Sequence, residues 1–186
     1  MLLGFAAPAL AAPVEVTRFH TPDSLATLGR RAVAVVPAAG GVASSLEQQT
    51  WIDAVGRELA ALGFGAATPG AADVMAEVRV ERETLHSERR RGPVSVGVGG
   101  STGGWHSGVG LGVGFSLGGG PRERVHTLLA VTLRDRASGR SLWEGRAENV
   151  ESAKAREAGA DLAATRLAHA LFAGFPGTSG GTVSAR

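Results

Sequence analysis

The expected fold is built on residues 125–149, VHTLLAVTLRDRASGRSLWEGRAEN, because they contain two predicted strands and the turn between them. Every second residue of the first strand falls on one face: Val125, Thr127, Leu129, Val131 and Leu133. A period of two is typical of a strand with one buried face. Residues 135–139, DRASG, supply a turn with glycine where a positive φ is needed. The return strand, residues 141–149, carries Leu142 and Trp143, so an antiparallel hairpin is predicted.

Three further strands are predicted on the N-terminal side of this hairpin. Residues 14–20, VEVTRFH, form the first. Residues 32–36, AVAVV, are continuously apolar and end at Pro37, which indicates a strand buried on both faces. Residues 73–86 alternate between apolar and charged side chains, which is typical of a half-exposed strand.

Two helices complete the expected domain. Ser44 and Glu47 form a capping box at the start of the first helix. Its apolar stripe is Ile52, Val55, Leu59 and Leu62. Gly63 and Phe64 then match a Schellman C-cap, with Phe64 packing back on the helix. The second helix is expected over residues 152–173, with an inner face of Ala160, Ala163, Leu167, Ala170 and Leu171.

This order of elements predicts an α+β fold: a two-layer sandwich whose largely antiparallel sheet carries two helices on one face. At 186 residues, one domain is the simplest division, and we place it at residues 13–176. Residues 177–186 are rich in glycine and small polar residues and are predicted to be a disordered tail.

Residues 92–120 are inserted between the predicted strands, and thirteen of these 29 residues are glycine. Their alternation predicts a glycine-rich β-hairpin with a loop at residues 100–107. As an interaction device it would pair edge-on with an envelope protein or with a second copy of the chain. The candidate contact residues are Trp105, His106, Val109, Leu111, Val113 and Phe115. One alternative is a surface hairpin without a dedicated partner. Another is insertion into a bilayer, which needs ~9–11 alternating residues per strand. Peripheral contact with a membrane surface is not predicted.

Residues 1–12, MLLGFAAPALAA, resemble the remnant of a secretory signal peptide: an apolar run precedes the A-x-A cleavage pattern Ala9-Leu10-Ala11. An apolar N-terminal arm is the alternative, since the basic n-region is missing. We therefore expect an exported protein that faces the periplasm or outer envelope. The chain has no cysteine, which excludes a disulfide, a thiolate metal site and a lipidated cysteine. A net charge of +2 gives no indication of nucleic-acid binding.

The sequence offers one enzymatic hypothesis. Residues 99–103 match G-x-S-x-G, the nucleophile elbow of α/β hydrolases, with Ser101 as nucleophile and with Asp135 or Asp161 and then His169 in triad order. The glycine-rich residues that follow would not form the helix that this elbow requires. No phosphate-binding glycine motif occurs, and the five histidines show no metal-ligand spacing. We expect no cofactor and no metal.

Several short segments, in this order and spacing, resemble the bacterial envelope family called domain of unknown function 4136. They are Val14-Glu15-Val16, AVAVVP at residues 32–37, Ser45-Leu46-Glu47, Gly63-Phe64, the glycine-rich insert, RDRASG at 134–139 with Leu142-Trp143 and Gly145-Arg146-Ala147, and LFAGFP at 171–176. The resemblance implies an exported protein, often a lipoprotein, and brings no catalytic residues with it. Without a cysteine, membrane anchoring does not carry over. We expect a non-enzymatic envelope protein with a structural or protein-interaction role. A small serine hydrolase that uses Ser101 is the alternative.

Overall fold

The computed structural model of the chain describes residues 11–40, 45–86 and 123–185. In chain order the elements are β1 (Val14–Phe19), α1 (Pro22–Leu28), β2 (Ala32–Pro37), α2 (Leu46–Ala61), β3 (Gly65–Ala66), β4 (Val74–His86), β5 (Glu123–Asp135), β6 (Ser141–Ser152), a 3₁₀ turn η1 (Arg156–Ala158), α3 (Ala160–Phe172) and β7 (Thr182–Ala185). The described strands form one seven-stranded sheet in the order β3-β2-β4-β5-β6-β1-β7.

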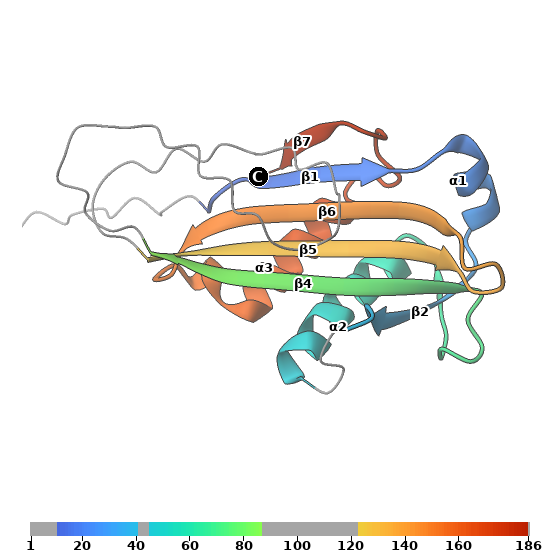
Figure 1. Ribbon diagram of the computed structural model, residues 1–186, viewed down its shortest axis with the longest axis horizontal. Helices are drawn as coiled ribbons and strands as arrows, with labels where there is room; N and C mark the ends of the chain where they lie inside the picture. The colour runs from blue at the N-terminus through green and yellow to red at the C-terminus, as the bar shows by residue number, and fades with distance from the viewer. Residues whose placement is uncertain (1–10, 41–44, 87–122, 186) are drawn as a thin grey trace, which may run out of the picture.

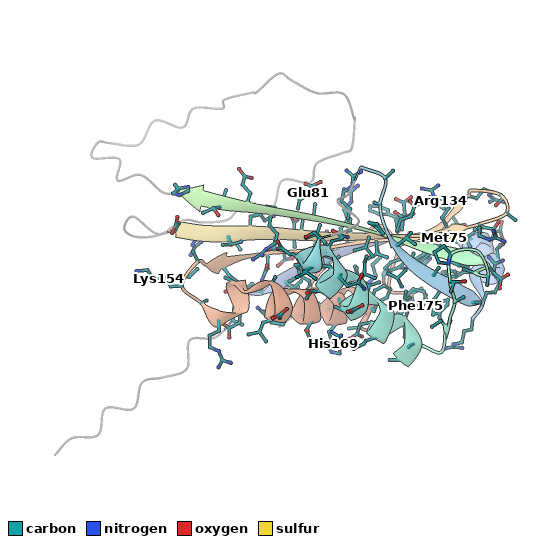
Figure 2. The ribbon with its side chains drawn as sticks, turned by 90° about the horizontal axis from the view of Figure 1, so that it is seen from below. Met75, Glu81, Arg134, Lys154, His169 and Phe175 are labelled. Atoms are coloured by element: carbon teal, nitrogen blue, oxygen red, sulfur yellow. The ribbon has the colours of Figure 1, made fainter. Side chains whose placement is uncertain are left out.

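The sheet and the two long helices form two layers (Figures 1 and 2). Helices α2 and α3 contact each other and cover the same face of the sheet, while α1 lies at the end of the molecule where β1 ends. Strand β2 runs parallel to both β3 and β4, and the other strand pairs are antiparallel. The expected α+β fold with a largely antiparallel sheet is confirmed, with parallel pairing limited to β2.

The β5–β6 hairpin is confirmed at the predicted place. Leu133 pairs with Trp143, and Gly139 in the turn has a φ of 70°. The predicted inner face of β5 is buried from Thr127 to Leu133. Strand β6 is longer than predicted: it continues to Ser152, which pairs with Arg124. As a consequence α3 begins only at Ala160, and the predicted helix start at residue 152 is wrong.

Helix α2 confirms the predicted C-cap and corrects the N-cap. Gly63 has a φ of 87°, its N–H donates to Ala60, and the N–H of Phe64 donates to Leu59, which is the Schellman pattern. The N-cap is Ser45, whose Oγ accepts from the N–H of Gln48, and Ser44 lies outside the described residues. The buried side of α2 is Trp51, Ala54, Val55 and Leu59. The predicted Ile52 is only half-buried, because the stripe is centred on Trp51 and Val55.

Helix α1 was not predicted, because the sequence around Pro22 indicates only the end of a strand. Thr21 and Ser24 form a reciprocal capping box: Thr21 Oγ1 accepts from the N–H of Ser24 at 3.1 Å, and Ser24 Oγ accepts from the N–H of Thr21 at 3.0 Å. Proline at the first helical position is compatible with this start. The local capping chemistry therefore allows a helix of only seven residues.

The predicted disordered tail is wrong for residues 182–185. They form β7, which pairs antiparallel with β1 from Val14↔Ala185 to Thr17↔Thr182. The hydroxyls of Thr17 and Thr182 lie 2.8 Å apart. Composition gave no sign of this strand, because its pairing depends on backbone groups that β1 presents at its outer edge. The glycine-rich hairpin predicted over residues 92–120 lies outside the described residues.

Candidate functional site

The six residues predicted to contact a partner lie outside the described part of the chain: Trp105, His106, Val109, Leu111, Val113 and Phe115. The structure describes the two strands that flank their segment. His86 ends β4 and Glu123 begins β5, and the two are register partners. His86 Nε2 lies 3.0 Å from Glu123 Oε1. The two described residues that flank segment 87–122 therefore lie side by side, at the tip of the two-stranded ribbon that β4 and β5 form.

Strand β4 has a second partner along only part of its length. Pairing with β2 ends at Pro37↔Val78, so Arg79–His86 pairs with β5 alone among the described residues. In Figure 1, β2 lies beside only the right-hand part of β4. The carbonyl of Val78 accepts from Ala38 on the β2 side. Because N–H and C=O of one strand residue point to the same edge, Val80, Arg82 and Thr84 present their backbone groups there. We call residues 79–86 the free edge of β4.

A groove of about 630 Å³ runs beside the start of this edge. Its walls are residues 38–40, the first turns of α2 and residues 78–82 of β4. Arg82 crosses it: its Nη1 lies 2.7 Å from Glu47 Oε1, and its Nη2 donates to the carbonyl of Ala158. Gln48 of α2 donates to the carbonyl of Val78. The groove therefore combines polar side chains with a strand edge.

Two buried N–H groups beside the groove have no acceptor among the described residues. They are Trp51 Nε1 and Arg82 Nε. Trp51 is fully buried and lines the groove from α2. A buried donor without an acceptor costs about 1–3 kcal/mol, and unsatisfied groups of this kind are uncommon in folded proteins. Sequence reasoning missed Trp51, although its position three residues before Ala54 and four before Val55 would have placed it on the inner face of α2.

Of the residues in the hydrolase hypothesis, Asp135 and His169 contact other groups, Asp161 lies in the first turn of α3, and Ser101 is not described. Hydrogen bonds from the side chain and backbone of Ser138, together with Arg31, lower the pKa of Asp135 from 3.8 to about 2. His169 is exposed, and its Nδ1 lies 3.4 Å from Glu58 Oε1. Asp135 therefore serves the β5–β6 turn and does not orient His169. Ser101 lies outside the described residues, so its role as a nucleophile stays an untested prediction.

The described residues contain no group of three or more acidic or histidine side chains that could hold a metal ion. His126 Nε2 lies 3.2 Å from Glu148 Oε2 on the open face of the sheet. His20 Nε2 lies 3.0 Å from the carbonyl of Gly177.

Among the residues that the structure describes, no helix is both long and apolar enough to cross a membrane.

A second polar cluster lies where β6 meets α3, two strands across the sheet from Arg82, because Arg82 pairs with Thr127 and Thr127 pairs with Asn149. Asn149 and Glu151 are buried on the helix-facing side of β6. Arg166 of α3 lies 2.8 Å from Glu151 Oε1, and the backbone of Ala12 contacts both charged side chains. The strand predicted from the sequence ends at residue 149, two residues before Glu151. Period two from Trp143 would have placed Glu151 on the buried face.

Comparisons with known proteins identify relatives of this chain. An uncharacterised protein of Zymomonas mobilis subsp. mobilis is 30% identical over an alignment of 217 residues, which covers 91% of this chain and 79% of the relative. A PelC dodecamer from Paraburkholderia phytofirmans matches with a TM-score of 0.43 and a point variant of it with 0.45, each at 14% identity over 83% of this chain and 91% of that chain. A PDZ domain protein from Parabacteroides distasonis matches with a TM-score of 0.49 at 11% identity, over 94% of this chain and 39% of that one.

The family comparison agrees with the resemblance seen in the sequence. The family described as "Domain of unknown function (DUF4136)" matches residues 28–177, which include every described element from β2 to α3. The match spans most of the chain and crosses the glycine-rich insert. The protein belongs to the DUF4136 family.

Proposed function

We propose that this protein is a non-enzymatic, exported module of the cell envelope, facing the periplasm or outer envelope, where it supports structure or binds another protein. The observation that carries the proposal is the free edge of β4 at residues 79–86, which adjoins the groove beside α2. An unpaired strand edge is a template for an added strand from another chain. The export part rests on the A-x-A pattern Ala9-Leu10-Ala11.

The partner that suits this edge is an extended peptide segment with charged side chains. The free edge carries alternating charges, with Arg79, Glu81, Arg82 and Glu83 in sequence. Charged residues on an edge prevent indiscriminate pairing, so a partner needs complementary charges as well as backbone groups. Both a segment of another envelope protein and a second copy of this chain have this chemistry. The glycine-rich segment, residues 87–122, joins the same ribbon tip and would add contacts through Trp105 and its neighbours.

Two changes at the ribbon test the proposal. Thr84→Pro removes an N–H that faces the free edge and leaves the β4–β5 hydrogen bonds in place, which an edge strand tolerates. Deleting residues 99–108 shortens the insert. Both variants should keep the circular dichroism spectrum of the parent and lose a cross-linked partner that the parent captures in the envelope. The matched control is Thr84→Ala, which keeps the N–H and should keep the partner.

Sedimentation of the purified protein separates the two kinds of partner. A concentration-dependent dimer that Thr84→Pro abolishes identifies a second copy, whereas a monomer that still forms a cross-link in the envelope identifies another protein. Equal capture by the parent, Thr84→Pro and the deletion would contradict a role for the ribbon.

A further inference from the structure

Glu151 is a buried carboxylate that takes part in none of the contacts described for the groove. It lies near the end of β6, is 6% exposed, and shares the helix-facing side of the sheet with Asn149 and Thr127, which are also buried. A buried carboxylate is costly unless charged or hydrogen-bonding groups surround it. The identity of those groups therefore indicates what the position is built to hold.

Three donors converge on one oxygen of this carboxylate. Arg166 Nη1 lies 2.8 Å from Glu151 Oε1, the backbone nitrogen of Ala12 lies 2.9 Å from it, and Asn149 Nδ2 lies 3.4 Å from it. Arg166 Nη2 also donates to the carbonyl of Ala12 at 2.7 Å. Glu151 and Arg166 thus hold the N–H and the C=O of a single backbone residue. We call these two side chains the Ala12 clamp.

Ala12 has a special position in the sequence. It directly follows Ala9-Leu10-Ala11, and cleavage at an A-x-A pattern breaks the bond after its second alanine. Hydrolysis of the Ala11–Ala12 bond by an export-associated peptidase adds a hydroxyl from water to the Ala11 carbonyl and a proton to the Ala12 nitrogen. An α-amino group has a pKa of about 7.7–8.0, so the new N-terminus takes up a second proton at neutral pH and becomes an ammonium.

We infer that the Ala12 clamp is the binding site for the N-terminus that cleavage between Ala11 and Ala12 creates. The same nitrogen that donates an amide N–H to Glu151 becomes a charged donor to a charged acceptor, and hydrogen bonds of that kind are about twice as strong as neutral ones. Ala11 is exposed, so its removal leaves no hole in the core. This inference rests on the export that is part of the proposed function.

The clamp would act on the strand that Ala12 leads into. Strand β1 begins two residues later and pairs with β6 from Glu15↔Glu148 onward. Chain termini fray unless they are tied down. An ion pair between the first residue of the processed chain and Glu151 would hold β1 at the register in which it pairs with β6. Folding and processing would then be coupled through one carboxylate.

The first test identifies the N-terminal residue of the exported protein. The full chain is produced in a Gram-negative host behind a short basic segment that supplies an n-region, and the periplasmic and cytoplasmic fractions are analysed by intact mass. A periplasmic protein that begins at Ala12 is expected. A periplasmic protein that begins elsewhere, for example at Leu10 after Ala7-Pro8-Ala9, would overturn the inference and leave the proposed function standing. A protein that stays in the cytoplasm with residues 1–11 attached would overturn the export itself.

The second test measures the ion pair. Glu151→Gln is introduced into the processed protein and into the full chain made in the cytoplasm, and urea unfolding is followed for all four proteins. The substitution should raise the unfolding constant at least ~10-fold more in the processed protein, because only there does it remove a partner from an ammonium. Glu144→Gln, at an exposed position of the same strand, should have equal small effects in both chains. Equal effects of Glu151→Gln in the two chains would overturn the clamp.

A third measurement requires no variant. Lys154 is the only lysine, so the processed protein has two amines, and mass spectrometry can follow their acylation separately. In the folded protein the Ala12 amine should react at least ~10-fold more slowly than in urea, because a protonated amine held by a carboxylate is a poor nucleophile. The exposed Lys154 should change little. An Ala12 amine that reacts equally fast in both states would contradict its binding by Glu151.

Discussion

Arg18 joins β1 to the end of α3, and replacing it should remove much of the stability of the domain. The side chain is 6% exposed. Its Nε donates to the carbonyl of Leu171, and its Nη2 donates to the carbonyls of Ala170 and Ala173, all at 2.9 Å. These carbonyls belong to the last turn of α3 and to its C-cap residue Ala173, where a helix has no backbone donors left to satisfy them. Burial lowers the pKa of Arg18 below its usual value, but an arginine keeps its charge in proteins.

The size of the expected loss in the free energy of unfolding follows from the carbonyl groups that Arg18→Met leaves without a donor. Three hydrogen bonds from a charged donor contribute about 1.5–3 kcal/mol each, and the desolvation of the guanidinium offsets part of that sum. Removing one partner of a buried charged contact typically costs about 3–5 kcal/mol. We expect Arg18→Met to lower the free energy of unfolding by about that amount, and Tm by roughly 6–20 °C for a chain of this size.

Urea unfolding followed by tryptophan fluorescence measures this loss, because Trp51 and Trp143 are both buried. The matched control is Arg146→Met, at an exposed position of the neighbouring strand β6, which should change stability by less than about 0.5 kcal/mol. A loss below about 1 kcal/mol for Arg18→Met would contradict this role of Arg18, because it would mean that water satisfies the end of α3 without the arginine.

Three other predictions concern the turn, the core and the absence of catalysis. The pKa of Asp135 is lowered to about 2, so its stabilising effect is complete above the ordinary value of 3.8 and is lost as pH falls through 2. Asp135→Asn should therefore lower the midpoint of urea unfolding at pH 6. A difference in midpoint between this variant and the parent that persists below pH 2 would contradict this. A Cβ on Gly145 would collide with the indole ring of Trp143, so Gly145→Ala should cost about 1–3 kcal/mol in urea unfolding. Gly70→Ala, with no atom within 4 Å, should be nearly neutral. The purified protein should hydrolyse short-chain esters no faster than its Ser101→Ala variant; a rate that depends on Ser101 would revive the hydrolase hypothesis.

Local signals predicted most of the sheet and both long helices. The β5–β6 hairpin followed from alternation in β5 and from Gly139, and the end of α2 followed from Gly63, because these signals act within a few residues. The pairing of β2 with β4, and that of β7 with β1, joins segments that are far apart in the sequence. Backbone groups at a strand edge make these pairs, and composition does not report them.

The groove could not be predicted for a similar reason. It brings together residues 38–40, the start of α2 and the part of β4 that extends beyond β2. No one of these segments carries a binding motif, and the groove exists because β2 ends at Pro37 while β4 continues to His86. Glu151 is an intermediate case. Its strand was predicted, and only the length of β6 hid that its carboxylate faces α3.

Contact with another chain through the free edge of β4 can be detected by a photo-cross-linking amino acid at position 84. The protein is expressed with an export signal, and the cross-link is made in the intact envelope. The control is the same amino acid at position 144, an exposed site on β6. We expect a discrete cross-linked product from position 84 that is absent from position 144 and that disappears in the variant without residues 99–108. No product at Thr84, or the same products at both positions, would contradict it.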